Sequence, residues 1–440
     1  MARMMIQNGR VIDPESRFDG PADLIIEDSL IREIRRRDGG PEKRGGAKEG
    51  GAPEKDGGPD TEVIDASGLI VAPGLVDVHV HFRDPGFLYK EDIESGAEAA
   101  KAGGFTTVVC MANTKPAVDT PETVRYVLEK GEKTGIHVRT AAAVTRGLGG
   151  RELTDMRALK AAGAAGFTDD GIPLMDERLV RQAMEQAKEL GVPLSFHEED
   201  PAFIENNGVN RGEVSRQLGI GGSPALAEDS LVARDLMIAL HTGARVEIQH
   251  ISSGVSVELV RLAKRLGADV WAEVTPHHFT LDETAVLRWG TLAKMNPPLR
   301  TAQDREALIR GLEDGTIDVI ATDHAPHSRE EKARPLTEAP SGIIGLETAL
   351  SLAVTELVKR GRLSYLQLFE KMCLNPARLY RMDCGRIREG QAADLVVFDD
   401  REPFTVKTFR SKASNSPFTG RSLYGRVCFT ICGGRVVYRG

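Results

Sequence analysis

The stretch VDVHVHFRDPG, residues 76–86, combines an apolar lead-in with a row of polar side chains. On a β-strand, residues i and i+2 point to the same face. His79, His81 and Arg83 are therefore expected to project together, opposite a face of apolar side chains. Two histidines at this spacing are by themselves more often part of an ordinary amphipathic edge strand. Whether these two histidines belong to a functional site depends on which other polar residues the fold places beside them.

This stretch belongs to the first of eight apolar segments of strand length between Leu75 and Pro376. Segments with helical periodicity lie between them, and two of these, residues 90–104 and 177–191, end at glycine. Eight β-then-α units over about 300 residues predict an α/β fold, a (β/α)8 TIM barrel. The strand candidates read GLVDVHVHF, TTVVCMAN, HVRTAAAV, AAGFTDD, VPLSFHEE, ARVEIQHIS, DVWAEVTPHH and DVIATDHAP.

The two ends of the chain have β-like patterns of their own. Short strands are expected in residues 4–13, 22–34 and 61–73, and again in residues 385–399 and 424–440. We expect the ends to pair into one small β-sandwich domain that flanks the barrel. The predicted division is an N-terminal part over residues 1–72, a metal-dependent catalytic barrel over residues 73–378 and a C-terminal part over residues 379–440.

Residues 38–60 interrupt the N-terminal part. They consist of glycine, proline and charged residues, with alanine as the only apolar residue type. Such a segment cannot bury enough apolar surface to offset the entropy lost on ordering. We therefore predict a flexible loop insertion here.

The composition of the 440 residues is that of an ordinary globular protein, with 41% hydrophobic and 28% charged residues. The net charge of -8 is spread along the chain, which argues against nucleic acid or an anionic membrane as the main partner. There is no signal-peptide core, and no apolar run approaches the roughly 20 residues of a transmembrane helix. The five cysteines include no CxxC pair. A reduced, cytoplasmic protein without structural zinc fingers is expected.

Polar residues gather at the carboxyl ends of the predicted strands, where TIM barrels place their catalytic groups. A single buried histidine is usually a core residue with its hydrogen bonds satisfied. A set of histidines and aspartates at the same end of one barrel instead forms a site for one or two metal ions, with imidazole and carboxylate donors. The set is His79, His81, Asn113, Asp169, Asp170, His197, His250 and Asp323.

The number of candidate ligands indicates two metal ions. His79, His81 and Asp323 are expected to hold one ion, and His197 and His250 the other. A carboxylate from the fourth strand would bridge them. Two such ions lower the pKa of a shared water enough to give hydroxide near neutral pH. Hydrolysis at a carbonyl or phosphoryl centre is therefore predicted, with His277 and His278 beside the site rather than among its ligands.

These residues resemble the amidohydrolase superfamily and, within it, the class I bacterial dihydroorotases. The resemblance runs over nearly the whole chain. HFRDPG, MANTKP and MNPPLR are its most specific motifs, because in that family they carry the substrate contacts. Further matching motifs are GFTDDG, SFHEED, QHIS, EVTPHH, ATDHAPH, GLETAL, NPAR and GQAADLVVFD.

The resemblance implies reversible cyclisation of N-carbamoyl-L-aspartate to L-dihydroorotate, a step of pyrimidine biosynthesis. It implies two zinc ions per chain, bridged by Asp170 and a hydroxide, although manganese and cobalt suit the same donors. Asp170 is preferred to Asp169 because it matches the family pattern. Asp323 acts as general acid and base in this scheme. The implied metal ligands are His79, His81, Asp170, His197, His250 and Asp323.

The α-carboxylate of such a substrate needs a binding site outside the metal centre. Arg83 is expected to bind it through charge-assisted hydrogen bonds. The other implied substrate contacts are Asn113, Asn296, His327 and Gly342. Ser341 stands where the family pattern has phenylalanine, which weakens the expectation for Gly342. Residues 328–340 fit either a mobile loop over the site or a merely solvated one.

Three alternatives share parts of this pattern. A hydantoinase or dihydropyrimidinase, or an allantoinase, would have the same fold and cyclic-amide chemistry. Many such relatives bridge their metals with a carbamylated lysine, but no lysine occurs between Lys160 and Lys188. The third is an inactive homologue serving as a structural partner of aspartate transcarbamoylase, which the complete ligand set disfavours. An active enzyme that forms a homodimer, with aspartate transcarbamoylase as a possible partner, is the preferred interpretation.

Overall fold

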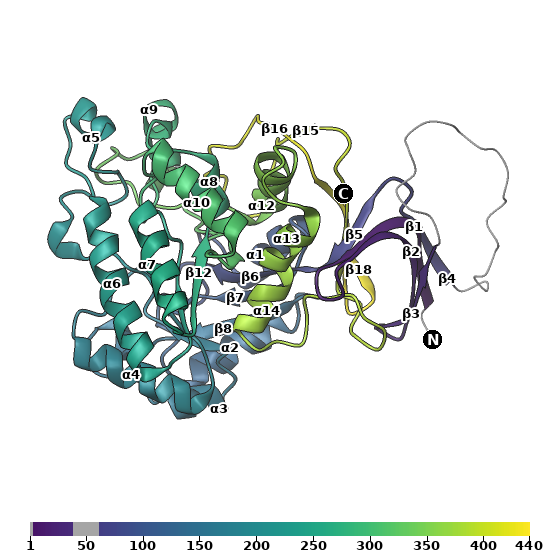
Figure 1. Ribbon diagram of the computed structural model, residues 1–440, viewed down its shortest axis with the longest axis horizontal. Helices are drawn as coiled ribbons and strands as arrows, with labels where there is room; N and C mark the ends of the chain where they lie inside the picture. Colours follow the sequence, from purple (N-terminus) through teal and green to yellow (C-terminus); the bar gives the residue numbers. More distant parts are fainter. Residues whose placement is uncertain (1–2, 38–60) are drawn as a thin grey trace.

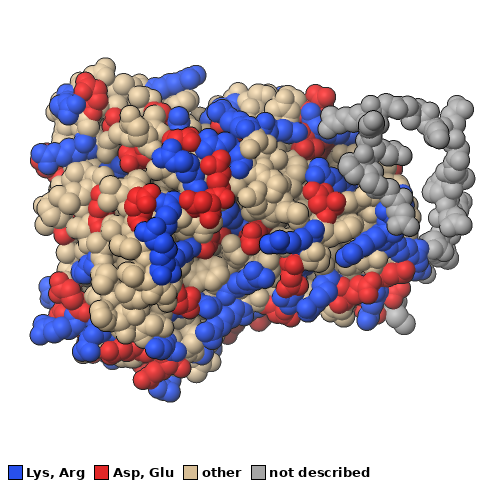
Figure 2. All heavy atoms as spheres, in the orientation of Figure 1, with Lys and Arg blue, Asp and Glu red and all other residues tan. Residues whose placement is uncertain are grey.

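The structure is a computed structural model that describes residues 3–37 and 61–440. A barrel of strands and helices lies beside a smaller unit of strands that contains the first and last described residues (Figure 1). The insertion predicted over residues 38–60 lies outside the described residues. On the face drawn in Figure 2, basic and acidic side chains are interspersed rather than gathered by sign.

Eight strands form the barrel in chain order, and every neighbouring pair is parallel. A parallel bridge between Val80 and His324, with the N–H of His81 donating to the His324 carbonyl at 2.9 Å, closes the ring. The predicted (β/α)8 barrel is therefore confirmed. The strands are β6 (Leu75–Val80), β7 (Phe105–Cys110), β8 (His137–Ala142), β9 (Gly166–Thr168), β10 (Leu194–Phe196), β11 (Val246–Ile248), β12 (Val270–Val274) and β13 (Val319–Ile320).

The longer helices surround this ring (Figure 1). Both helices predicted from residues 90–104 and 177–191 are present, and each ends at glycine. Asp176 caps the second at its start, and Gly191 closes it with a left-handed φ of 66°. None of the described helices is long and apolar enough to cross a membrane. The longer helices are α1 (Ile93–Ala102), α2 (Pro121–Gly131), α4 (Glu177–Leu190), α6 (Ala225–Thr242), α7 (Gly254–Arg265), α10 (Ala302–Asp314) and α12 (Leu346–Ala353).

Shorter helices fill the connections between strands. The shorter helices are α3 (Met156–Ala161), α5 (Glu213–Leu218), α8 (Pro276–Thr280), α9 (Ala285–Trp289), α11 (Arg329–Lys332), α13 (Tyr365–Phe369) and α14 (Asn375–Leu379). Single 3-10 or π turns occur at Arg146–Leu148, Pro201–Phe203, Gly290–Ala293, Val354–Val358 and Glu370–Leu374.

The two ends of the chain form one small β-domain beside the barrel, as predicted, and its strands belong to a single mixed sheet rather than to the two sheets of a sandwich. β5 (Ile70–Pro73) pairs antiparallel with β14 (Leu395–Asp399), and this pair joins the N-terminal strands to the C-terminal ones. Buried aliphatic side chains from both ends, such as Ile6 and Leu395, share one core cluster. The other strands of this sheet are β1 (Arg3–Asp13), β2 (Phe18–Glu27), β3 (Leu30–Arg36), β4 (Thr61–Asp65), β17 (Arg426–Cys432) and β18 (Arg435–Arg439).

Two of the predicted N-terminal strands are wrong in extent, because each contains a turn. Residues 22–34 are divided at Asp28 and Ser29, whose φ angles of 48° and 76° are left-handed and incompatible with a strand. Residues 61–73 are divided at Gly68, where φ is 74°. The chain there changes from β4 to β5, which pair with successive parts of β1.

One part of the C-terminal segment leaves this sheet and lies against the barrel. It begins at β15 (Phe404–Thr405) and returns at β16 (Ser422–Leu423), which pair with each other. Phe418 from this segment shares a buried cluster with Met295 and Ile343 of the barrel. The segment brings C-terminal residues to the carboxyl end of the barrel. The division of the chain near residues 73 and 379 stays a prediction.

Candidate active site

Six side chains with metal-ligand chemistry converge at the carboxyl ends of five barrel strands. His79 is in β6, and His81 follows it directly. Asp170, His197, His250 and Asp323 come one to three residues after β9, β10, β11 and β13. All six are at most 7% exposed. The irregular backbone after each strand turns these side chains inward, and His250 and Asp323 adopt left-handed φ angles of 32° and 46° to do so.

The six side chains form two groups that share Asp170. Its Oδ1 lies 3.4 Å from His79 Nε2, and its Oδ2 lies 3.4 Å from His81 Nε2. On the other side, Oδ1 lies 3.8 Å from His197 Nδ1 and 4.0 Å from His250 Nε2. The ligand atoms of His79, His81 and Asp170 lie within 4.8 Å of one another, and so do those of Asp170, His197 and His250. One carboxylate is thus placed between two pairs of imidazoles.

Asp323 belongs to the first group. Its Oδ1 lies 3.0 Å from His81 Nε2 and 3.6 Å from His79 Nε2. The Nε2 atom of His79 is buried and has no hydrogen-bond partner among the residues that the structure describes. Leaving a buried polar atom unpaired is costly, so this nitrogen is placed for a ligand outside the protein chain. Imidazole and carboxylate donors at these distances fit borderline divalent ions.

Asp170 and His250 have the charge form that binds metal, whereas at His79 and His197 the effect of burial is outweighed by nearby carboxylates that raise the pKa of these rings. Burial opposes a charge on Asp170, but the neighbouring His79, His81 and His197 outweigh it and hold the pKa of its carboxyl well below the usual value. Burial, with His197 and His79 nearby, holds the pKa of His250 well below its usual value. An ionised carboxylate and a neutral imidazole are the forms that bind metal.

Asp169 takes no part in this cluster. Its carboxylate accepts hydrogen bonds from the N–H groups of Val144 and Thr145 and from the Thr145 hydroxyl. Burial raises its pKa to about 6. Asp169 therefore holds the turn after β8, and Asp170 is the member of the pair that faces the histidines.

A cavity of 270 Å³ opens directly on the metal-ligand groups. Every substrate contact expected from the sequence lines it, namely Arg83, Asn113, Asn296, His327 and Gly342. His81, Asp170, His197, His250 and Asp323 line it as well. Ligand-type residues and polar binding residues thus share one cavity.

Arg83 reaches this cavity in a way that the strand argument did not foresee. β6 ends at Val80, and Arg83 has a left-handed φ of 60°, so it does not continue the strand face of His79 and His81. In the described part of the chain, no carboxylate forms an ion pair with Arg83. Its guanidinium contacts the Pro326 carbonyl at 3.4 Å and His327 Nε2 at 3.5 Å. Burial lowers the pKa of this group.

The two asparagines have different surroundings. Asn113 Nδ2 donates to Asp170 Oδ2 at 2.9 Å, and Asn113 Oδ1 lies 2.9 Å from His81 Nδ1. Asn113 therefore holds two candidate metal ligands in addition to lining the cavity. Asn296 Nδ2 lies 3.4 Å from His197 Nε2, and its Oδ1 has no partner among the described residues.

His327 and Gly342 lie on facing loops. His327 Nε2 lies 2.8 Å from the Ser341 carbonyl, and Lys90 Nζ lies 3.4 Å from His327 Nδ1. Burial, with Arg83 and Lys90 nearby, lowers the pKa of His327, so its ring is neutral. The N–H of Gly342 donates to the Lys294 carbonyl at 2.9 Å and is not free for a ligand.

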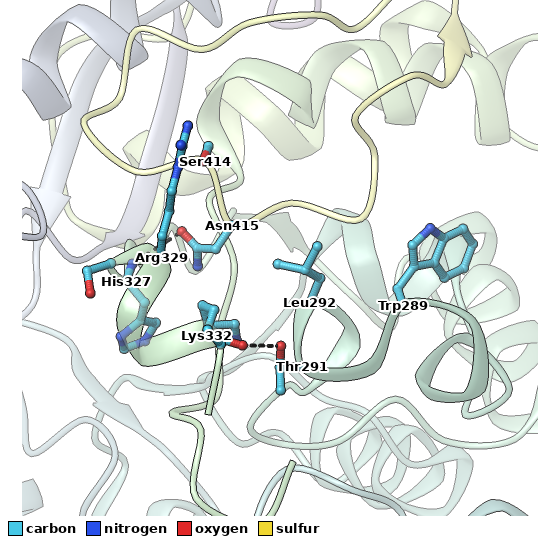
Figure 3. Close-up of a pocket in the computed structure, with 10 residues that line it drawn as sticks. Trp289, Thr291, Leu292, His327, Arg329, Lys332, Ser414 and Asn415 are labelled. Carbon is cyan, nitrogen blue, oxygen red and sulfur yellow. Dashed lines mark hydrogen bonds between the residues drawn. The ribbon is translucent and has the colours of Figure 1, made fainter. Parts of the chain in front are cut away.

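A second cavity of 380 Å³ adjoins the first, and His327 lines both (Figure 3). Its other walls come from α11, the turn at Gly290–Ala293 and residues 414–415. The Thr291 hydroxyl donates to the Lys332 carbonyl at 2.6 Å, as Figure 3 shows. Lys332 Nζ donates to the carbonyls of Pro340 and Gly342 at 2.9 and 3.0 Å. Residues 328–340, expected to be mobile or solvated, are tied to the site through this lysine.

The sequence prediction missed several residues that touch the candidate ligands. Glu273 Oε1 lies 2.9 Å from His79 Nδ1, and Glu199 Oε2 lies 3.3 Å from His197 Nε2. The available signal for Glu273 was a carboxylate inside a strand of otherwise apolar residues, VWAEV. His278 was expected beside the site. Its two ring nitrogens contact Thr275 Oγ1 and the Pro297 carbonyl at 2.8 and 3.0 Å.

Comparison with known proteins agrees with this fold and site. The model of the Amidohydrolase family matches residues 70–437. A dihydroorotase of Clostridioides difficile (strain 630) is 59% identical over 435 residues, which cover 99% of both chains. A dihydroorotase of Lactococcus lactis subsp. lactis is 49% identical over 437 residues, again 99% of both chains.

Solved structures with the same fold include two hydantoinases. The L-hydantoinase (dihydropyrimidinase) from Arthrobacter aurescens is 27% identical, with a TM-score of 0.85 over 100% of this chain and 96% of that one. The D-hydantoinase (dihydropyrimidinase) from Thermus sp. is also 27% identical, with a TM-score of 0.82 over 99% and 95% of the two chains. The chain therefore belongs to the amidohydrolase family and, within it, to the dihydroorotases.

Proposed function

We propose that the chain catalyses the reversible cyclisation of N-carbamoyl-L-aspartate to L-dihydroorotate, the dihydroorotase step of pyrimidine biosynthesis. One observation carries this choice of substrate among cyclic amides. Arg83 forms no ion pair with any described carboxylate, and it lines the same 270 Å³ cavity as the candidate metal ligands. A guanidinium without a partner anion, facing a cavity, suits a carboxylated substrate.

Two divalent ions are the proposed cofactors, and zinc is the expected metal. His79, His81 and Asp323 would hold one ion, His197 and His250 the other, with Asp170 between them. The unpaired Nε2 of His79 and the shared position of Asp170 support this assignment. When bound, such ions supply an activated water and polarise the carbonyl that is attacked.

Asp323 is the proposed general acid and base. It is the one candidate ligand carboxylate, besides Asp170, that lines the cavity among the described residues. Asp170 lies between four imidazoles, whereas Asp323 lies against two, on one side of the cluster. During hydrolysis, Asp323 takes the proton that the attacking water loses and delivers it to the amide nitrogen as the ring opens. During cyclisation, it removes a proton from the carbamoyl nitrogen.

The substrate carboxylate is placed by Arg83 and its neighbours. Arg83 gives two N–H groups in a fixed plane, which suits bidentate contact with a carboxylate. His327, held neutral beside Arg83, and Asn296, whose Oδ1 is unpaired, are the proposed flanking contacts. Asn113 is proposed to serve both the substrate and the ligands that it already contacts. Gly342 would line the cavity beside the substrate without donating its N–H, which is already bonded to the Lys294 carbonyl.

The experiment is an assay of both directions of the reaction together with the metal content. Purified protein should contain about two divalent ions per chain and should turn over dihydroorotate and carbamoylaspartate. Hydantoin and dihydrouracil, cyclic amides without the carboxylate, serve as matched controls. If the protein contains metal but turns over these neutral amides faster than dihydroorotate, a hydantoinase-type activity replaces the proposed function. Metal-free protein that stays inactive when zinc is supplied would favour an inactive structural homologue.

We also propose a cytoplasmic homodimer, with aspartate transcarbamoylase as the candidate protein partner. The five cysteines are free, which suits a reducing compartment. Light scattering after size-exclusion chromatography tests the dimer. Co-elution with purified aspartate transcarbamoylase at micromolar concentration tests the partner, and separate elution would remove it.

A further inference from the structure

Glu273 is a fully buried carboxylate on β12 that touches both groups of candidate ligands through one oxygen. Its Oε1 lies 2.9 Å from His79 Nδ1 and accepts the backbone N–H of His250 at 3.1 Å. We propose that Glu273 is a positioning residue that selects the metal-binding tautomer of His79 and fixes the backbone of His250. This inference rests on the proposed metal-dependent function.

The first role of Glu273 concerns the proton on the His79 ring. Its Nε2 faces Asp170 and Asp323 at 3.4 and 3.6 Å and must carry a free lone pair to bind metal. The ring proton must therefore reside on Nδ1. An ionised carboxylate has no proton to donate and acts as an acceptor only. Glu273, at 2.9 Å, therefore stabilises the form of His79 with the proton on Nδ1.

A neighbour of the opposite character makes this selection necessary. Gln249 Nε2 lies 3.3 Å from the same Nδ1 of His79. An amide N–H donor favours a lone pair on Nδ1, which would move the ring proton to Nε2 and block metal binding there. With Glu273 present, the carboxylate determines the tautomer. Without Glu273, Gln249 would favour the unproductive one.

The second role of Glu273 concerns the backbone of His250. This residue has a left-handed φ of 32°, which is strained for a side chain other than glycine. The N–H of His250 donates to Glu273 Oε1, so the carboxylate holds the peptide in the orientation that points the ring at Asp170. One oxygen thus stabilises a ligand in each of the two groups.

A second buried carboxylate lies near Glu273. Glu247, on the neighbouring strand β11, is also fully buried, and its Oε2 accepts the Ser195 hydroxyl at 2.5 Å. Ser195 Oγ in turn lies 3.1 Å from the Tyr380 hydroxyl. These groups lie inside the barrel and do not line the cavity.

The test compares Glu273→Gln, which keeps the volume, and Glu273→Leu, which leaves Gln249 as the polar neighbour of His79 Nδ1. Asp318→Asn is the matched control, because Asp318 is a carboxylate at the start of β13 that pairs with Lys264 and contacts no candidate ligand. Zinc affinity is measured by competition with a chromophoric chelator, starting from metal-free protein. We expect a loss of about 10–100-fold for Glu273→Leu, a smaller loss for Glu273→Gln and none for the control.

A second readout separates positioning from a general structural role. In metal-free protein labelled with ¹⁵N-histidine, at a pH at which the His79 ring is neutral, the His79 signals, assigned with a His79→Gln variant, report which nitrogen is protonated. We expect the proton on Nδ1 in the wild type and on Nε2 in Glu273→Leu. Should Glu273→Leu fail to fold, Glu273→Gln still carries the affinity test. Wild-type zinc affinity in Glu273→Gln, or a tautomer unchanged in folded Glu273→Leu, would overturn the inference.

Neither readout depends on turnover of dihydroorotate. If the wild-type protein binds zinc but turns over a different cyclic amide, the proposed substrate fails and the role of Glu273 stands. If dihydroorotate is turned over and the variants bind zinc like the wild type, the proposed function stands and the role of Glu273 fails.

Discussion

Asn113 and Asp170 are joined by a hydrogen bond of 2.9 Å, and the other end of the same amide contacts His81 Nδ1 at the same distance. The amide fixes the carboxylate that lies between the two ligand groups. It also leaves His81 Nε2 free to face the site. We predict that Asn113→Ala lowers zinc affinity about 10–100-fold, measured by chelator competition.

Asn296→Ala is the matched comparison for this prediction. Asn296 lines the same cavity, but it contacts Nε2 of His197 and not the Nδ1 atom that faces Asp170. Its loss should raise KM for dihydroorotate and leave zinc affinity unchanged. Equal zinc affinities in the two variants would show that Asn113 does not hold the ligands.

Arg83→Met should raise KM for dihydroorotate with a smaller effect on kcat. A hydrogen bond to a charged group contributes about 1.5–3 kcal/mol, which corresponds to about 10–150-fold in binding. Arg83→Lys should recover only part of this loss, because an ammonium cannot give the planar pair of N–H groups. Steady-state kinetics with dihydroorotate check both variants. An unchanged KM in Arg83→Met would place the substrate carboxylate elsewhere.

Asp323→Asn should lower kcat by about 10²–10⁴-fold, because the amide cannot accept the proton. The amide oxygen can still lie against His81 and His79, so we expect most of the zinc to be retained. Elemental analysis and turnover measured on the same sample check this. Loss of zinc in step with activity would make Asp323 mainly a ligand.

The sequence was sufficient for the barrel, because its strands are continuous apolar runs buried on both faces. All six residues of β6 and all six of β7 are buried, for example. The positions of His197 and His250 followed from the same logic, since each lies one or two residues after such a strand. Local patterns of this kind carry the fold when side chains on both faces of a strand meet a core.

The missed features depend on contacts between distant parts of the chain. Arg83 lines the cavity because the backbone turns at a φ of 60°, which alternation along a strand does not foresee. Glu273 meets His79 across 194 residues of sequence. Asn415 donates to the Ala325 and Gly342 carbonyls from a segment that leaves the terminal sheet. Sequence spacing holds no information about such pairs.

Lys332 leads to a prediction about pH. Burial, together with the nearby Lys294, lowers the pKa of its ammonium from 10.5 to about 7. Between these two values the unfolded chain binds a proton at Lys332 and the folded chain does not. The free energy of unfolding therefore rises with pH across this window, by at most about 1.4 kcal/mol per pH unit.

Lys332→Met removes this dependence and also the hydrogen bonds from Nζ to the carbonyls of Pro340 and Gly342. The variant should be less stable than the wild type, and the difference in melting temperature should widen as the pH rises from 7 to 10. Thermal unfolding of both proteins across this range provides the measurement. A constant difference would mean that the two carbonyls keep Lys332 protonated in the folded chain, because an ammonium of ordinary pKa adds no slope below pH 10.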